Sequence, residues 1–267
     1  MTVTYRRLLA SIGWCCISLV TLALPEAHAQ TDQSQFKQLR NGIKSFPNIT
    51  NAWGLENISV HPMEISSGNF IRAFVPKGAI DPGTMKNRGL PRGGAGFKSV
   101  VFPSGVDRAA FSYWVRFPIG FDFVLGGKLP GLYGGKGNSG GKIPDGTDGF
   151  SFRLMWGKGG LGKVYAYLPT SVRYGTALFD HEFQFQPGQW HQIKQEVILN
   201  TPGKSDGIVR MWVDSQFLGE ERDILMRTVS TLRINGMFFD VFFGGGDDRW
   251  APKSDTHIDF SNFQLTF

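Results

Sequence analysis

From Trp53 onward the sequence is divided into short segments in which apolar and polar residues alternate. The segments are separated by glycine, proline, asparagine and aspartate, and the chain has 35 glycines and 14 prolines. Many short strands with frequent turns and no long helix are typical of an all-β sandwich or barrel. The one helical segment expected there is EERDILMR, 220–227. The expected strands are 54–60, 69–76, 96–102, 110–117, 149–156, 162–168, 189–199, 207–214, 234–243 and 256–266.

The N-terminal segment has the features of a secretory signal peptide. A basic start is followed by an apolar run and by the small-residue site Ala27-His28-Ala29, so we expect residues 1–29 to be removed. The run is short for a spanning helix, which makes an uncleaved anchor the less favoured alternative. Residues 30–50 are polar and are expected to form a flexible lead-in to a single domain, 51–267. The mature protein is therefore expected to be secreted or periplasmic.

Both cysteines, Cys15 and Cys16, precede the expected cleavage site, so the mature chain would have neither a disulfide nor a cysteine-ligated metal site. Removal of Arg6, Arg7 and Glu26 with this segment reduces the 28 basic and 22 acidic residues to 26 and 21. A basic exported protein suits a polyanionic partner such as an acidic polysaccharide. The charge alone would equally fit a soluble basic protein that has no such partner.

Two segments place polar side chains on one face of a predicted hairpin. The apolar residues of 149–156 and 162–168 alternate with polar ones, so the apolar set is expected to face the core. The short link GKGGL favours a hairpin in which Arg153 lies opposite Tyr165 and Ser151 opposite Tyr167. A slip of one residue would break the match between the faces. The other face then carries Ser151, Arg153, Met155, Lys163, Tyr165 and Tyr167.

A second concentration of signals lies at 121–141, FDFVLGGKLPGLYGGKGNSGG. Lys128 follows two glycines and precedes Leu-Pro-Gly. Glycine at such positions allows the backbone to pass close to a ligand. The polar, glycine-rich stretch 134–148 that follows is expected to be a long loop that lines or covers a cleft.

Several reaction types lack their usual residues in this chain. The sequence has neither GxSxG nor HExxH, and its histidines have no metal-ligand spacing. The paired carboxylates of a retaining glycosidase would have to be Asp180 and Glu182, which follow a loop. We therefore expect no metal and no cofactor. A nucleic-acid partner is not expected either, because the aromatic residues are not interleaved with a basic groove pattern.

Lysine, arginine, serine and two tyrosines on one sheet face fit β-elimination from a 4-linked uronic acid. The C5 proton becomes acidic only when the C6 carboxylate is neutralised, and arginine can bind that carboxylate through two hydrogen bonds. A base must take the C5 proton and an acid must protonate O4. Tyrosine can do either if positive charge from Lys128, Arg153 or Lys163 lowers its pKa. The same face could instead bind acidic sugars without cleaving them.

Five segments together are specific enough to identify a family resemblance: GGKLPGLYGG, FSFRLMW, KVYAYLP, QWHQIKQEVILNTPGKSDGIVRMWVD and FFDVFFGGGDDRWAPKSDTHIDFSNFQL. They resemble polysaccharide lyase family 14, which includes alginate lyases of marine molluscs and a virus-encoded glucuronate-degrading lyase. The resemblance covers about Phe97 to Phe267, and residues 30–95 match less clearly. It implies a β-jelly-roll sandwich of two antiparallel sheets with a concave substrate cleft, and it implies functional roles for Lys128, Ser151, Arg153, Tyr165 and Tyr167.

The roles expected of these residues follow the chemistry above. Arg153, helped by Ser151 or Lys128, would neutralise the C6 carboxylate. One tyrosine would be the base, and in a syn elimination the same tyrosine could protonate O4. Tyr165 is favoured over Tyr167 because it is expected to lie opposite Arg153, and direct participation of Lys128 is the alternative. Lys163 is expected to help bind the substrate.

The chain is thus expected to be a secreted, monomeric polysaccharide lyase that cleaves a uronate polymer of the alginate or glucuronan type. Its partner would be the acidic polysaccharide, with no membrane contact after the signal peptide is removed. The alternative is a non-catalytic protein that binds acidic polysaccharides on the same fold, because fold alone does not determine function. Pocket shape, rather than these residues, decides among mannuronate, guluronate and glucuronate.

Overall fold

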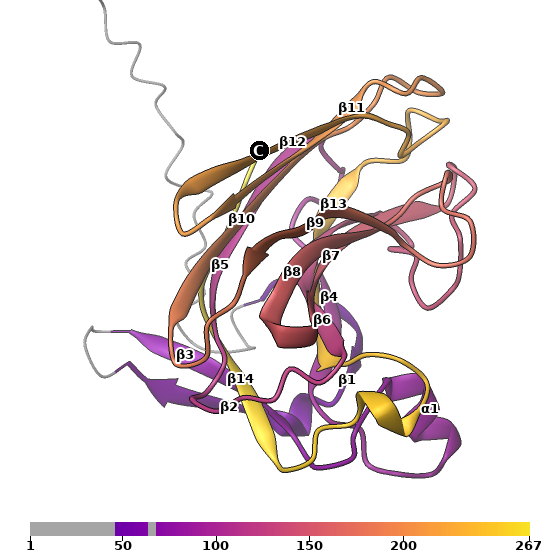
Figure 1. Ribbon diagram of the computed structural model, residues 1–267. Helices are drawn as coiled ribbons and strands as arrows, with labels where there is room; N and C mark the ends of the chain where they lie inside the picture. The colour runs from indigo at the N-terminus through magenta and orange to yellow at the C-terminus, as the bar shows by residue number, and fades with distance from the viewer. Residues whose placement is uncertain (1–45, 64–67) are drawn as a thin grey trace, which may run out of the picture. The chain divides into compact units, whose positions relative to one another are not determined.

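The computed structural model describes residues 46–63 and 68–267, which form two antiparallel sheets of seven strands each (Figure 1). Sheet A has the order β1 (Ile49–Trp53), β4 (Ala95–Val100), β13 (Ile234–Phe243), β6 (Gly126–Gly135), β7 (Gly149–Gly157), β8 (Leu161–Tyr167) and β9 (Thr176–Gln184). Sheet B has the order β12 (Gln216–Ile224), β11 (Gly207–Val213), β10 (Trp190–Ile198), β5 (Arg108–Arg116), β14 (Thr256–Thr266), β3 (Asn69–Val75) and β2 (Ile58–Pro62). The all-β sandwich prediction is confirmed.

Helical structure is limited to short pieces between strands. Helix α1 (Pro82–Asn87) begins after Asp81, whose carboxylate accepts a hydrogen bond from the Thr84 N–H and so caps the helix. The 3₁₀ turns are η3 (Leu55–Asn57), η4 (Lys158–Gly160) and η5 (Asp248–Trp250). In the part of the chain that the structure describes, no helix has the length and apolar character needed to cross a membrane. The predicted signal peptide, 1–29, lies outside the described residues.

The core lies between the two sheets and is rich in aromatic rings. Alternate residues of β5 and β7 meet there, and Phe111, Tyr113, Phe150 and Phe152 are each at most 1% exposed. Each large apolar side chain buried in this way contributes about 1.5–3 kcal/mol. The packing of one face of every strand against this core leaves the opposite face of sheet A available for polar residues.

One predicted element has the wrong secondary structure. Residues 220–227 were expected to be helical, but most of them belong to β12, an edge strand that pairs with β11. Glu220 of β12 lies opposite Arg210 and forms an ion pair with it at 2.8 Å. The local helix propensity of EERDILMR is therefore overridden by cross-strand pairing, which has no local signal.

The sequence analysis also missed parts of sheet A. Strands β1, β6 and β9 were not predicted. Glycines interrupt β6, and a phase change at Phe179 and His181, both with positive φ, interrupts β9. The described residues begin at Phe46, within the expected lead-in 30–50. Phe46 is 6% exposed, and its ring lies 5.0 Å from that of Phe97.

Strand β6 contains a β-bulge that is held in place from sheet B. Its pairing with β7 shifts between Leu129 and Gly131, and both Leu129 and Leu132 are fully buried although they are three positions apart. Tyr113 donates a hydrogen bond to the Pro130 carbonyl at 3.1 Å, and the Gln195 side chain accepts one from the Leu132 N–H at 3.1 Å. The Gln195 amide also donates to the Phe152 carbonyl of β7 at 3.0 Å. Backbone groups near the bulge are thus satisfied by the opposite sheet.

Candidate active site

The predicted register of the β7–β8 hairpin is confirmed. Arg153 lies opposite Tyr165, and Ser151 lies opposite Tyr167. The turn passes through Gly159, whose φ of 68° lies in the left-handed region that favours glycine. Strand β6 pairs with the other edge of β7 and adds Lys128, opposite Met155, to the same face. The structure therefore brings together all the predicted site residues, namely Lys128, Ser151, Arg153, Lys163, Tyr165 and Tyr167, on the outer face of sheet A.

Lys128 occupies a half-buried position beside Tyr165. Its Nζ lies 2.8 Å from Met155 Sδ, a weak acceptor, and 4.3 Å from the centre of the Tyr165 ring. Burial and, to a smaller extent, the positive charge of Arg153 hold the pKa of Lys128 well below its usual value of 10.5, although Asp240 opposes this shift. A larger fraction of this amine is therefore unprotonated near neutral pH, which enables it to accept a proton.

The pKa of Tyr165 moves in the opposite direction. Tyr165 is half-buried, and this burial raises the pKa of its hydroxyl above the usual value of 10.0; a backbone hydrogen bond from Gly175 and the charge of Arg153 oppose the shift. The expectation that adjacent positive charge would lower this pKa is wrong, because the loss of hydration outweighs the charge attraction. A phenol that stays protonated is suited to donate a proton.

Arg153 is almost completely buried and is paired with Asp240 of β13. Its Nη1 lies 2.5 Å from Asp240 Oδ2, and the two side chains are 3% and 6% exposed. Its guanidinium also lies 4.9 Å from the centre of the Phe238 ring, and its Nε has no hydrogen-bond partner. At 3% exposure the guanidinium is covered by its surroundings in this arrangement, and the direct contact with a sugar carboxylate that the sequence analysis expected of Arg153 stays a prediction.

Ser151 and Tyr167 hold the loop 136–148 against the face. The Ser151 hydroxyl is fully buried and donates to the Asn138 carbonyl at 2.6 Å. The Tyr167 hydroxyl accepts a hydrogen bond from the Gly141 N–H at 2.9 Å, and its side chain is 2% exposed. The loop thus covers this end of the face. Both side chains contact the loop, and their expected parts in substrate binding and catalysis stay predictions.

The remaining cations of the face keep part of their surface exposed. Lys163 lies opposite Met155, in the same cross-strand row as Lys128, and its side chain is 23% exposed. It forms an ion pair with Asp180 of β9 at 3.0 Å. Lys98 of β4 is half-buried; it donates to the Lys136 carbonyl and lies 4.9 Å from the centre of the Phe238 ring. The face is therefore rich in positive charge, which suits a polyanionic ligand.

Sequence reasoning missed Asp240 and Lys98. Asp240 had a local signal, because it is the one charged residue in the apolar run FFDVFF. A carboxylate in such a strand must be paired or protonated. Lys98 had no comparable signal, because its link to the site is a contact with the backbone of the loop 136–148.

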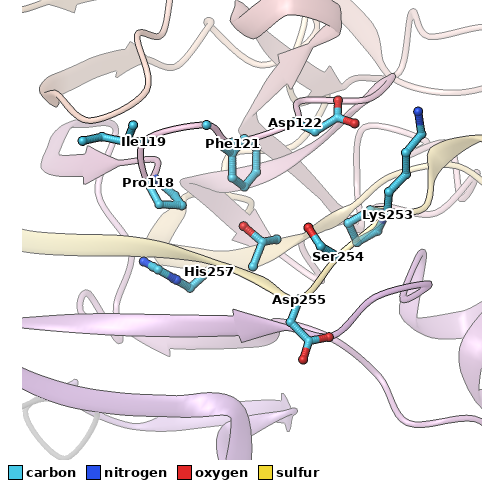
Figure 2. Close-up of a pocket in the computed structure, with 11 residues that line it drawn as sticks. Pro118, Ile119, Phe121, Asp122, Lys253, Ser254, Asp255 and His257 are labelled. Carbon is cyan, nitrogen blue, oxygen red and sulfur yellow. The ribbon is translucent and has the colours of Figure 1, made fainter.

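The alternative carboxylate pair does not form a site. Asp180 and Glu182 lie on β9 and are both exposed, and Asp180 is engaged by Lys163. A separate pocket of about 240 Å³ lies between the segments 118–122 and 252–257, and Figure 2 shows Asp122, Lys253, Asp255 and His257 around it. None of the predicted site residues lines this pocket. The outer face of sheet A thus remains the candidate active site.

Comparisons with known proteins agree with this fold. The Polysaccharide lyase 14 family model matches residues 64–263. The crystal structure of the marine PL-14 alginate lyase from Aplysia kurodai is similar, with 35% sequence identity, a TM-score of 0.73, and coverage of 84% of this chain and 92% of that chain. No curated protein matches the chain.

Two more distant structures share the fold. The alginate lyase from a Chlorella virus has 23% identity and a TM-score of 0.70, with coverage of 85% of this chain and 95% of that chain. The endo-β-1,4-glucuronan lyase from the fungus Trichoderma reesei has 10% identity and a TM-score of 0.56, with coverage of 86% and 93%. The jelly-roll prediction is confirmed by this similarity together with the two antiparallel sheets. The family match and the relative at 35% identity establish that the chain belongs to polysaccharide lyase family 14.

Proposed function

We propose that this polysaccharide lyase cleaves a 4-linked uronate polymer of the alginate type by β-elimination, with Lys128 as the base and Tyr165 as the acid. The observation that carries the proposal is the contact of the Lys128 amine with the Tyr165 ring at 4.3 Å, in an environment that lowers the pKa of the lysine and raises that of the tyrosine. Two groups whose environments move their pKa values in opposite directions are suited to accept and donate protons at one pH. The similarity to the Aplysia alginate lyase supports the choice of polymer.

The reaction balances with these two groups alone. The Lys128 amine takes the C5 proton, and the electrons of that bond form a double bond between C4 and C5. The C4–O4 bond breaks, and the Tyr165 hydroxyl gives its proton to O4. The products are an unsaturated uronate at the new non-reducing end and a new reducing end. Exchange with solvent then restores both groups.

The C6 carboxylate must be neutralised while the C5 proton leaves. Lys163 is the best-placed cation, because it lies in the row of Lys128 and keeps 23% of its side chain exposed. Arg153 contributes from below the surface, where Asp240 offsets part of its charge. We therefore assign neutralisation of the C6 carboxylate to Lys163 and to the combined positive charge of this face, and not to a direct contact with Arg153.

The placement of Lys128 and Tyr165 on one face favours syn elimination. In 4-linked D-mannuronate and D-glucuronate the C5 proton and O4 leave from the same side of the ring, whereas in L-guluronate they leave from opposite sides. We therefore expect polymannuronate to be cleaved faster than polyguluronate. We also propose that the protein is exported by residues 1–29 and acts as a monomer outside the cytoplasm.

The test measures the ultraviolet absorbance of the unsaturated product with polymannuronate, polyguluronate and glucuronan, each with and without EDTA. We expect a rise with polymannuronate that EDTA does not change. Tyr165→Phe, which keeps the ring and removes the hydroxyl, should lower kcat by about 100- to 10,000-fold. Binding of the polymers without any product would instead support a non-catalytic binding protein.

A further inference from the structure

Asp240 is the one ionisable residue of β13, INGMFFDVFF. Its neighbours Phe239 and Val241 are fully buried in the core, so the Asp240 carboxylate lies on the outer face of sheet A. The side chain is nevertheless only 6% exposed. Burial of a carboxylate in such a place lowers the stability of the fold unless the carboxylate has a charged partner.

The backbone is shaped to let Asp240 reach Arg153. Strand β6 runs between β13 and β7, and its residue opposite both Phe238 and Arg153 is Gly131. A Cβ on Gly131 would lie 2.6 Å from the Arg153 Cα and 1.9 Å from the Phe152 carbonyl oxygen, so no side chain fits there. On the other edge of β13, a Cβ on Gly96 would lie 2.3 Å from Asp240 Oδ1. Gly96 thus leaves room for the Asp240 carboxylate, and Gly131 lets the backbone of β6 pass close to that of β7 at Arg153.

Asp240 is the carboxylate at the centre of a group of cations. Arg153, Lys128 and Lys98 all act on it electrostatically, and Arg153 bonds to it directly. Lys128 in turn faces the positive charges of Arg153 and Lys163, the negative charges of Asp240 and Asp81, and the ring of Tyr165. Asp240 is therefore the buried negative charge that acts on both Lys128 and Arg153.

We infer that Asp240 is a positioning residue of the lyase site, which fixes the Arg153 guanidinium below the Lys128–Tyr165 pair and sets how readily Lys128 holds a proton. The inference rests on the proposed function for its effect on turnover, and its effect on Lys128 can be measured without substrate. The Asp240 charge opposes the burial and the cations that lower the pKa of Lys128. Removal of the Asp240 charge should therefore make Lys128 lose its proton at still lower pH.

The first experiment follows the titration of Lys128 by NMR of the lysine Cε and Hε signals, assigned with the Lys128→Met protein. Asp240→Asn keeps the shape of the side chain and removes its charge. The Lys128 midpoint should fall by on the order of one pH unit relative to the wild type. The acid limb of the pH profile of kcat/KM should move to lower pH by the same amount, while kcat falls at least about tenfold because Arg153 loses its partner. A merely structural role would lower activity without moving the titration.

Asp223→Asn is the matched control, because Asp223 is exposed on β12 of the other sheet and its φ of 60° is one that asparagine tolerates. This variant removes the same charge and should leave the Lys128 midpoint unchanged. An Asp240→Asn protein that is folded and titrates Lys128 at the wild-type midpoint would overturn the inference.

Loss of one partner from a buried ion pair can prevent folding. In that case the Asp240→Asn protein and the wild type are both titrated at low temperature with the osmolyte TMAO, which favours the folded state. The Lys128 midpoint should still be lower in Asp240→Asn, and equal midpoints would again overturn the inference. If the wild type gave no product with any uronate polymer, the proposed function would fail, but the Lys128 titration would still decide the role of Asp240.

Discussion

The Nζ atom of Lys128 lies 4.3 Å from the centre of the Tyr165 ring, although β7 runs between the strands that carry these residues. Met155 of β7 lies between the two strands in this row, and its sulfur accepts a hydrogen bond from the Lys128 amine at 2.8 Å. The Lys128 side chain therefore reaches across β7 to the Tyr165 ring. The proposed proton acceptor and the proposed proton donor are thereby held on one surface before any substrate arrives.

Replacement of Lys128 by methionine should separate catalysis from stability. Methionine keeps much of the length and apolar volume of lysine but has no amine, so kcat should fall by about 100- to 10,000-fold. The melting temperature should not fall, because the variant removes a cation that burial disfavours. Lys194→Met, on the exposed surface of sheet B, is the control and should keep wild-type turnover. Wild-type turnover in Lys128→Met would exclude Lys128 as the base.

The pH profile of kcat/KM should be bell-shaped. The base must be unprotonated, so activity should rise as pH increases through the pKa of Lys128, which lies well below 10.5. The acid must be protonated, so activity should fall as pH passes the pKa of Tyr165, which is raised above 10.0. Initial rates at low substrate concentration over this range give both limbs. A profile that falls from neutral pH upward would contradict the assignment of the two roles.

Ser151→Ala should affect the stability of the loop 136–148 more than it affects the rate of the chemical step. The variant removes the donor to the buried Asn138 carbonyl and should cost about 1–3 kcal/mol of unfolding free energy. Hydrogen exchange in the loop should become faster, and KM should rise by a larger factor than kcat falls. Ser215→Ala removes an exposed hydroxyl that bonds to Gln192 and serves as the control. Unchanged loop protection together with a large loss of kcat would instead indicate direct participation of Ser151.

Gln195→Leu should destabilise the whole sandwich. The variant removes the side-chain partner of the Leu132 N–H and of the Phe152 carbonyl inside the core, at up to about 1–3 kcal/mol for each group. Urea unfolding followed by circular dichroism measures this loss. Gln192→Leu on the same strand is the control, because Gln192 is half-buried and its side chain bonds only to the exposed Ser215 hydroxyl. Equal unfolding midpoints for the two variants would show that the contacts of Gln195 carry no net stability.

The parts of the site that the sequence predicted are those with a local pattern. In the β7–β8 hairpin, alternation defines the two faces and the glycine-rich turn fixes the register, so Arg153 was correctly placed opposite Tyr165. Strand β12 shows the limit of such reasoning, because the local propensity of 220–227 is helical and the pairing with β11 that overrides it has no local signal.

The partners and charge states of the site residues could not be read from the sequence. Arg153 pairs with Asp240, 87 positions later, because the sheet order places β13 beside β6. The nearby positive charges suggested that the pKa of a site tyrosine would be lowered. In the folded protein the effect of burial is larger than that of these charges, and it raises the pKa of Tyr165. Burial and sheet order are both properties of the assembled sandwich, and neither has a signature in a single segment.

The support of the β6 bulge by Tyr113 and Gln195 has a consequence for protein design. Grafting Lys128, Tyr165 and their neighbours onto the sheet of another jelly roll would transfer the side chains but not the supports beneath them. A functional graft would also have to include the two supporting positions of the opposite sheet. A design that selects residues by their distance from the substrate would leave these positions out. The transferable unit of this enzyme is therefore a block through the full thickness of the sandwich, not a surface.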